Sequence, residues 1–168
     1  RFAGIAPYPS IVSTDFLSLA SDDFLFQTIN KGRPGRPMLA WGERENGLKP
    51  DDIRALVAYI RQLGGNVQQQ PDPRPQVWAT GDVNTGARLF ASNCSGCHGK
   101  NAEGADGPGL NNKVFLSSVT DTFLVSTIGN GRTGTVMQGF LNPSPTRREL
   151  TQAEIESVVV YLRSLGGK

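Results

Sequence analysis

Residues 7–41 recur, without a gap, as residues 106–140. At an offset of 99, which carries Met38 onto Met137, the two stretches share aromatic, acidic, glycine and arginine positions. The matched pairs include Phe16 and Phe115, Asp22 and Asp121, Phe24 and Phe123, Gly32 and Gly131, and Arg33 and Arg132. After three extra residues in the second copy, LKPDDIRALVAYIRQLGG matches LTQAEIESVVVYLRSLGG. Self-similarity of this extent indicates an internal duplication.

The two copies differ in completeness, and a linker separates them. Residues 66–79 begin with NVQQQPDPRPQVW, a composition that favours an extended, semi-rigid connection over a packed element. We therefore divide the chain into a partial or degenerate copy at residues 1–65, a Gln/Pro-rich linker at 66–79 and a complete domain at 80–168.

Both copies end in a predicted amphipathic helix. In the second copy, Thr151 and Glu154 have the spacing of a capping box. Apolar residues follow at helical spacing, namely Ile155, Val158, Val159 and Leu162. In the first copy, Pro50 at the first helical position, with acidic residues in the first turn, opens the equivalent helix.

Shorter helices are predicted earlier in each copy. Ser21 and Thr120 are candidate N-caps of helices that end near Gly32 and Gly131. A further helix, from about residue 85 to 95, has no counterpart in the first copy. Since no segment has a convincing strand pattern, we predict an all-α fold.

Composition excludes some classes of function. The net charge of +2 is too small to indicate binding to nucleic acid or to an anionic membrane surface. Basic residues gather at Lys31, Arg33 and Arg36 and at Arg147 and Arg148, and we interpret both groups as solvated loops. No apolar run approaches the roughly 20 residues that a membrane-spanning helix needs. The chain opens without an initiator methionine, so we expect a processed or truncated product.

Both cysteines and the single histidine of the chain lie within five consecutive positions, in NCSGCHGK. Thiols three positions apart can both add to the vinyl groups of one haem, and the next imidazole then lies under the iron. A redox-active cysteine pair would need a βαβ context, and zinc would need further ligands. These readings and a structural disulfide stay open, but the spacing favours haem attachment at Cys94 and Cys97 with His98 beneath the iron.

A haem iron needs a ligand on its other face. Met137 follows His98 by 39 residues, in the Gly-rich loop GNGRTGTVMQGF. A thioether favours ferrous iron, so His/Met ligation raises the reduction potential. We predict Met137 as the distal ligand and interpret Met38 as a packing residue. Arg132, just before Met137, is predicted to hydrogen-bond a haem propionate, with a solvated arginine as the alternative.

The second copy resembles the class I c-type cytochromes over residues 80–168. The resemblance rests on GARLFASNCSGCHG, GPGL, MQGF and the final YLRSLGG. It implies a haem c held by Cys94 and Cys97, with His98 as proximal ligand and the Pro108 carbonyl orienting its imidazole. It also implies that the first and last helices cross at Gly86, Phe90 and Tyr161. Gln138 stands where the family often has a proline.

The first copy resembles only the C-terminal half of such a domain. Its own attachment motif would end one or two residues before Arg1. Two interpretations are open: the chain comes from a tandem dihaem cytochrome, or the first copy has lost its haem. The sequence supports one haem c, and a second requires an upstream motif. Without haem or an opening helix, the first copy must bury its apolar side chains against another part of the protein or against another subunit.

The resemblance implies electron transfer rather than catalysis. We expect a low-spin haem that passes single electrons between redox partner proteins, as a subunit or partner of a respiratory or dehydrogenase complex. The family implies a periplasmic or extracytoplasmic location. The alternative function is that of a dihaem peroxidase or a small-gas-binding haem protein, which would require displacement of Met137.

Overall fold

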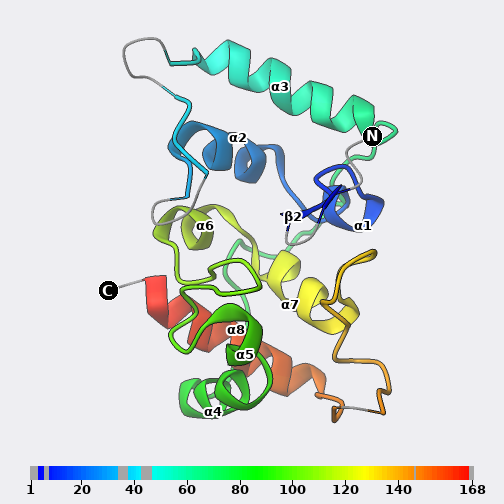
Figure 1. Cartoon of the computed structure of the whole chain (residues 1–168), viewed down its shortest axis with the longest axis vertical. Helices are drawn as coiled ribbons and strands as arrows, with labels where there is room; N and C mark the ends of the chain where they lie inside the picture. The colour runs from blue at the N-terminus through cyan, green and yellow to red at the C-terminus, as the bar shows by residue number, and fades with distance from the viewer. Residues whose placement is uncertain (1–3, 6–7, 34–37, 43–46, 146, 167–168) are drawn as a thin grey trace.

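The computed structural model describes residues 4–5, 8–33, 38–42, 47–145 and 147–166, and these form the predicted all-α fold (Figure 1). The helices are α1 (Thr14–Leu17), α2 (Asp22–Lys31), α3 (Pro50–Leu63), α4 (Val83–Asn93), α5 (Ser95–His98), α6 (Lys113–Ser118), α7 (Asp121–Asn130) and α8 (Gln152–Gly166). Two short strands, β1 (Gly4–Ile5) and β2 (Tyr8–Pro9), pair antiparallel. The sequence did not predict this ladder, because two residues carry no alternating pattern.

The predicted helix starts are confirmed by their caps. The hydroxyl of Ser21 accepts the backbone N–H of Phe24 at 3.0 Å, and that of Thr120 accepts the N–H of Phe123 at 3.1 Å. At the start of α8, the N–H of Thr151 donates to a Glu154 carboxylate oxygen at 2.9 Å, and the N–H of Glu154 donates to the Thr151 hydroxyl at 3.3 Å. Each side chain satisfies a backbone donor that the first helical turn leaves unpaired.

The helix predicted at 85–95 begins and ends two residues earlier in the structure. It begins at Val83, because the carboxylate of Asp82 caps it by accepting the N–H of Thr85 at 2.6 Å. It ends at Asn93, and Cys94 lies between it and the one-turn helix α5. The break at Cys94 turns the chain out of the axis of α4.

Helices α4 and α8 cross closely, and Gly86 lies at the contact. A Cβ atom at Gly86 would come within 2.0 Å of the Ser157 carbonyl oxygen. The rings of Phe90 and Tyr161 pack with centroids 5.4 Å apart. The predicted crossing at these residues is confirmed, and a glycine at position 86 is what permits it.

In both halves an arginine ties the last helix to the helix pair before it. Arg61 of α3 donates to Asp22 Oδ1 at 2.8 Å and to the carbonyls of Leu17 and Ala20 at 2.6 Å each. Arg163 of α8 makes the matching set of bonds, to Asp121 Oδ1 and to the carbonyls of Leu116 and Val119. The residues of the second network are numbered 99 higher than their counterparts in the first, except for the arginine, which is numbered 102 higher. The two halves thus repeat one buried network.

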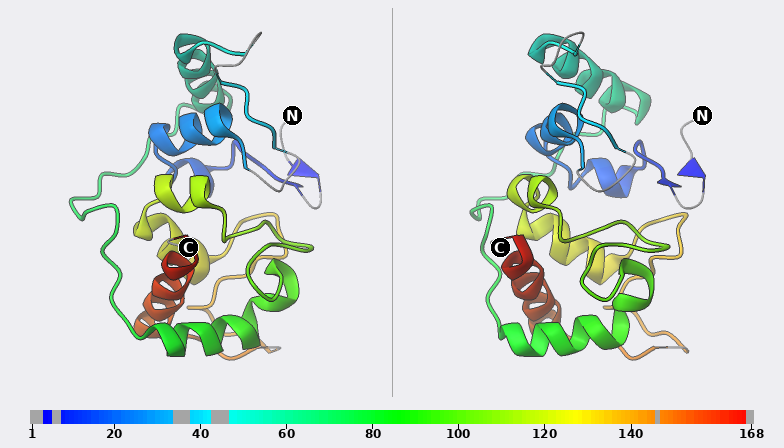
Figure 2. Two further views of the ribbon diagram at one scale, coloured as in Figure 1. Left: turned by 90° about the vertical axis from the view of Figure 1, so that its left-hand side faces the viewer. Right: turned by 60° about the vertical axis from the view of Figure 1, so that its left-hand side comes forward.

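The two halves pack through a reciprocal aromatic cluster. Phe16 meets Phe123 edge-on with ring centroids 5.9 Å apart, and Phe24 meets Phe115 in the same way at 5.9 Å. Phe24 and Phe123 lie between these pairs, 5.3 Å apart. Helix α2 of the first half thereby lies against α6 of the second (Figures 1 and 2). All four rings are buried.

Residues 66–79 contain no helix or strand and run along one side of the molecule from the first half to the second (Figure 2). Within the described part of the chain, no helix has both the length and the apolar character needed to cross a membrane.

Candidate haem-binding site

The turn between α4 and α5 gathers the sulfur and imidazole groups. The backbone N–H groups of Cys97 and His98 both donate to the carbonyl of Cys94, at 3.2 and 3.0 Å. Cys94 is half-buried, Cys97 is exposed, and His98 is 9% exposed. One helical turn therefore carries both thiols and the imidazole.

The ring of His98 is fixed in place by the segment that follows. Its Nδ1 lies 2.8 Å from the carbonyl oxygen of Pro108. Because a carbonyl can only accept, Nδ1 carries the proton and Nε2 keeps its lone pair for a metal. Gly107 leaves room for the ring, since a Cβ there would lie 3.0 Å from His98 Cε1. The expected orienting role of Pro108 has the required geometry.

The Cys94 thiol does not have the electrostatics of a reactive cysteine. Burial, followed by the nearby Cys97, raises the pKa of the Cys94 thiol to about 11. Reactive cysteines have a lowered pKa, because a neighbouring positive charge or helix N-terminus stabilises the thiolate. Both cysteines are unpaired here. The donor set, with an oriented imidazole beside two unpaired thiols, fits covalent haem attachment.

The loop that carries Met137 is closed by its own backbone. The N–H of Arg132 donates to the Met137 carbonyl at 2.8 Å, and Gly131, at φ 78°, makes the turn. A Cβ at Gly131 would come within 2.4 Å of that carbonyl oxygen. In the first half, the N–H of Arg33 donates to the Met38 carbonyl at 2.8 Å, and Gly32 has φ 64°. Both methionines are half-buried, and the carbonyl of each accepts the same backbone bond.

Arg132 is directed toward the first half of the chain. Its guanidinium lies 4.6 Å from the ring centre of Phe16, its Nη2 donates to the Ser10 carbonyl at 3.3 Å, and its Nε is 3.9 Å from Asp15 Oδ2. Burial lowers the pKa of Arg132, and the charge of Asp15 partly offsets this. Contact with a haem propionate remains a prediction. The link to Asp15, 117 positions away, has no local signal in the sequence.

Arg33 mirrors this arrangement, and our interpretation of it as a solvated loop residue was wrong. Its guanidinium lies 4.8 Å from the ring centre of Phe115 in the second half. Burial, followed by the charge of Arg132, lowers the pKa of Arg33. Arg36, assigned to the same loop, lies outside the described residues.

We also interpreted Arg147 as a solvated loop residue, but it packs on the segment after Met137 and hydrogen-bonds to it. It is half-buried, its guanidinium lies 4.3 Å from the ring centre of Phe140, and its Nη2 donates to the Gly139 carbonyl. Its Nη1 is buried without a hydrogen-bond partner in the described part of the chain, and so is Oγ1 of Thr127 in α7. Buried polar atoms in native proteins are normally bonded, so both atoms can serve a bound group.

Comparison with known proteins agrees with this geometry. The family profile described as cytochrome c matches residues 83–166, from the start of α4 to the end of α8. This chain belongs to the cytochrome c family. The matched part of the cytochrome contains the Cys94–His98 turn, the Pro108 carbonyl, the Met137 loop and the crossing of α4 with α8.

Two of the following three relatives match more of the chain than this domain. The Cbb3-type cytochrome c oxidase subunit FixP of Bradyrhizobium sp. is 33% identical over 98% of this chain and 54% of its own length. Subunit CcoP of Rhodobacter capsulatus is 32% identical over 71% of the chain and 38% of its own length. Cytochrome c-L of Methylorubrum extorquens is 40% identical over 49% of the chain and 40% of its own length. The cytochrome thus spans about half the length of the first of these relatives.

Proposed function

We propose that this cytochrome holds one haem c on Cys94 and Cys97, with His98 and Met137 as axial ligands, and passes single electrons between redox proteins. The observation that carries the proposal is the His98–Pro108 hydrogen bond of 2.8 Å beside two unpaired thiols. That bond fixes the tautomer in which Nε2 can bind iron, and it makes the imidazole a better donor.

The residues of the chain would set the redox properties. The haem supplies a reversible one-electron change at its iron. Met137 brings a soft thioether that favours the ferrous state and raises the potential, and Pro108 keeps the imidazole from rotating. Val136, beside Met137, is 91% exposed and offers an apolar contact for a partner. Weak, transient redox complexes use small surfaces of this kind.

A catalytic role would require an open coordination position. In a peroxidase or a gas-binding haem protein, Met137 would have to leave the iron. The bonds that close its loop, from Arg132 to the Met137 carbonyl and from Arg147 to the Gly139 carbonyl, oppose such movement. We therefore favour electron transfer over catalysis in this chain.

The relatives support membership of a respiratory complex. FixP and CcoP are named as subunits of Cbb3-type cytochrome c oxidase, and the similarity to FixP covers 98% of the chain. We propose that this chain serves as an electron-transfer subunit of a similar oxidase, on the periplasmic or extracytoplasmic face of the membrane.

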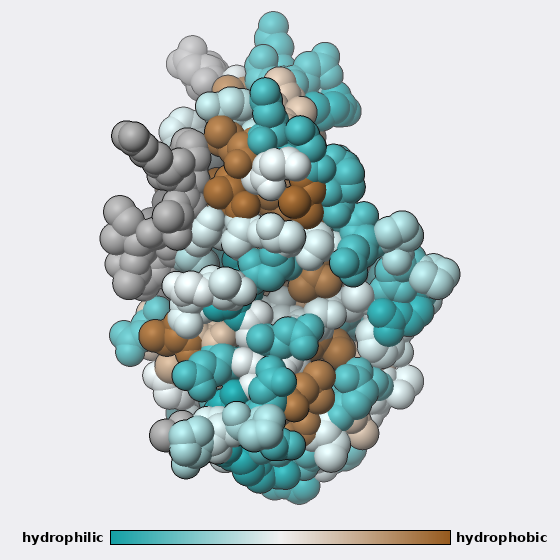
Figure 3. Space-filling model, turned by 90° about the vertical axis from the view of Figure 1, so that its right-hand side faces the viewer, coloured by the Kyte–Doolittle hydropathy of each residue, from teal (hydrophilic) through white to brown (hydrophobic). Residues whose placement is uncertain are grey.

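We further propose that the chain is a tandem of two copies, divided at residues 1–65, 66–79 and 80–168. The repeated arginine networks and methionine loops support this division. No helix of the described residues covers the face of α3 that corresponds to the α4-covered face of α8, and Leu56, Tyr59 and Leu63 are exposed there (the first half is the upper part of Figure 3). One haem c belongs to this chain. A second would require an attachment motif upstream of residue 1, with Met38 as its distal ligand.

A spectroelectrochemical titration tests the proposed function. The purified protein should show a low-spin spectrum that converts reversibly between two states in a single one-electron step. A spectrum of five-coordinate iron, with carbon monoxide or peroxide binding to the unmodified protein, would instead favour the enzymatic alternative.

A further inference from the structure

The groove between α7 and α8 in the second half is filled by the linker. Oδ2 of Asp121 accepts two consecutive backbone N–H groups, from Trp78 at 2.6 Å and from Ala79 at 2.7 Å. The indole Nε1–H of Trp78 donates to the Thr122 hydroxyl at 2.9 Å. The guanidinium of Arg74 covers the indole ring, 4.0 Å from its centre. This extended segment leaves the side chain of Asp121 with 0% exposure.

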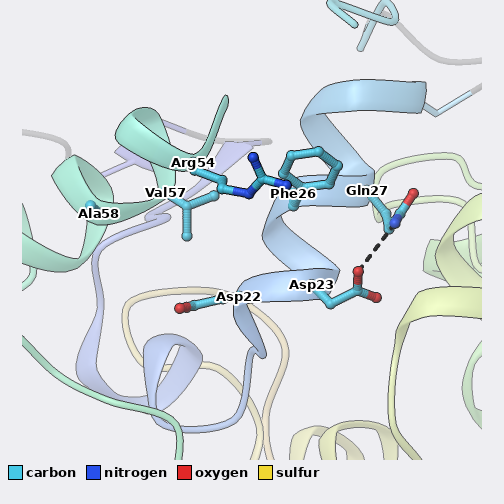
Figure 4. A pocket seen from close by; sticks show the side chains of 7 residues that line it. All are labelled: Asp22, Asp23, Phe26, Gln27, Arg54, Val57 and Ala58. Carbon is cyan, nitrogen blue, oxygen red and sulfur yellow. Dashed lines mark hydrogen bonds between the residues drawn. The ribbon is translucent and has the colours of Figure 1, made fainter. Parts of the chain in front are cut away.

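The corresponding groove in the first half is open. It is a pocket between α2 and α3 (Figure 4), lined by Asp22, Asp23, Phe26, Gln27, Arg54, Val57 and Ala58. Asp22 Oδ1 binds Arg61, as Asp121 Oδ1 binds Arg163. The side chain of Asp22 is nevertheless 68% exposed. Its Oδ2 accepts no hydrogen bond from the part of the chain that the structure describes, whereas Oδ2 of Asp121 accepts two.

The open pocket offers part of the chemistry of the filled one. Asp23 stands where the second half has Thr122, so its carboxylate can accept an indole N–H. Arg54 lies 5.7 Å from the ring centre of Phe26 and provides a flat cation beside an apolar wall. Arginine stacks readily on aromatic faces, as Arg74 does on Trp78. Two carboxylates at the mouth disfavour an anionic ligand.

We propose that this pocket is the docking site of an extended peptide segment that carries a tryptophan, supplied by a partner polypeptide. Two consecutive N–H groups of the peptide donate to Asp22 Oδ2, and the indole packs on Phe26 with its N–H toward Asp23, while Arg54 moves off the Phe26 ring to cover the outer face of the indole. A second copy of this chain is a poor occupant, because its own segment at 72–79 is already bound to its own second half.

The probe for this proposal is a synthetic peptide with the sequence of residues 71–81, PDPRPQVWATG. The haem-loaded protein, reduced and labelled with nitrogen-15, is titrated with it while amide NMR signals are followed. Saturable shifts are expected in α2 and α3. A peptide in which alanine replaces the tryptophan should bind about tenfold more weakly, since a buried aromatic anchor commonly contributes 1.4 kcal/mol or more.

Two substitutions on one helix separate docking from general surface effects. Ala58→Arg fills the pocket and should weaken binding about tenfold or more. Ala55→Arg adds the same side chain at an exposed position of α3 that does not line the pocket, and should leave binding unchanged. Equal thermal stability of the two variants confirms that the fold is kept.

Other outcomes would overturn the proposal. One is the absence of saturable shifts in α2 and α3 at millimolar peptide, and another is equal binding by both variants. A third is concentration-dependent dimerisation that Ala58→Arg abolishes, because the occupant would then be a second copy of the chain.

Discussion

At the level of single residues, most of the candidate haem site could be predicted from the sequence. The Cys94, Cys97 and His98 cluster is local in the chain, so its spacing alone predicted the shared turn. The Pro108 carbonyl came from family resemblance, and the structure places it 2.8 Å from His98 Nδ1. The roles of Arg33 and Arg147 were missed, because a charged residue in a Gly-rich loop has no local signal for stacking on a distant ring.

The first prediction concerns the distal ligand. Met137→Ala should abolish the weak far-red band of a ferric iron–thioether bond and allow carbon monoxide to bind the ferrous iron. Met38→Ala is the matched control, since the Met38 carbonyl accepts the equivalent backbone bond in the first half, and it should leave the band intact. If Met38→Ala removed the band instead, our assignment of the two copies would be wrong.

A second prediction concerns Arg132 and the contact between the halves. Arg132→Gln should reduce the free energy of unfolding by about 1–2 kcal/mol, from the lost contact with Phe16 and the weakened hydrogen bond to Ser10. Chemical denaturation of the haem-loaded protein measures this. A shift in reduction potential without loss of stability would instead favour the propionate contact.

The pH dependence of that contact follows from Asp15. Burial acts to raise the pKa of Asp15, but hydrogen bonds from Ser13 and Thr133 and the charge of Arg132 outweigh it and hold the pKa below its usual 3.8. A carboxylate whose pKa is lower in the folded than in the unfolded state stabilises the fold at pH values above its unfolded-state pKa. This stabilisation is lost as the pH falls through the folded-state pKa. Asp15→Asn should therefore flatten the fall in melting temperature below about pH 4. If the melting temperature of the variant fell with pH as steeply as that of the unmodified protein, this prediction would be contradicted.

At the scale of the element, capping residues fixed the helix starts. Ser21, Thr120 and Thr151 each precede a helix that the structure contains. The ends were harder to predict. The break between α4 and α5 falls at Cys94, which is neither glycine nor proline, so no helix-breaking residue marks it.

The crossing of α4 and α8 makes a prediction about Gly86. Gly86→Ala would place a methyl group 2.0 Å from the Ser157 carbonyl oxygen, so the helices must separate. We expect the free energy of unfolding to fall by about 1–3 kcal/mol. Gly96→Ala is the control, because nothing lies within 4 Å of a Cβ there. Equal melting temperatures for the two variants would contradict the close crossing.

At the scale of the whole molecule, the repeat predicted two similar halves but not how they meet. The reciprocal contacts of Phe16 with Phe123 and of Phe24 with Phe115 join residues more than 90 positions apart, and periodicity gives no information about such pairs. The sequence required only that the apolar side chains of the first copy be covered. The second half covers part of these side chains, while Leu56 and Tyr59 stay exposed.

This arrangement predicts that residues 1–65 do not fold alone. Separation would expose Phe16 and Phe24, and each large apolar side chain loses roughly 1.5–3 kcal/mol when it is exposed. A chain of about 65 residues has little stability to lose. Circular dichroism should show no cooperative thermal transition for this fragment, whereas residues 80–168 with haem should melt cooperatively. A cooperative transition in the first fragment would make it an autonomous module.

Covalent attachment of one haem at Cys94 and Cys97 is tested by the intact mass of the protein after denaturation in acid. Two thioether bonds survive unfolding, so the mass should equal that of the bare chain plus one haem. Double replacement of Cys94 and Cys97 by alanine should return the mass to that of the bare chain. Recovery of the bare-chain mass from the unmodified protein, purified from cells that attach haem to a known c-type cytochrome, would contradict the account.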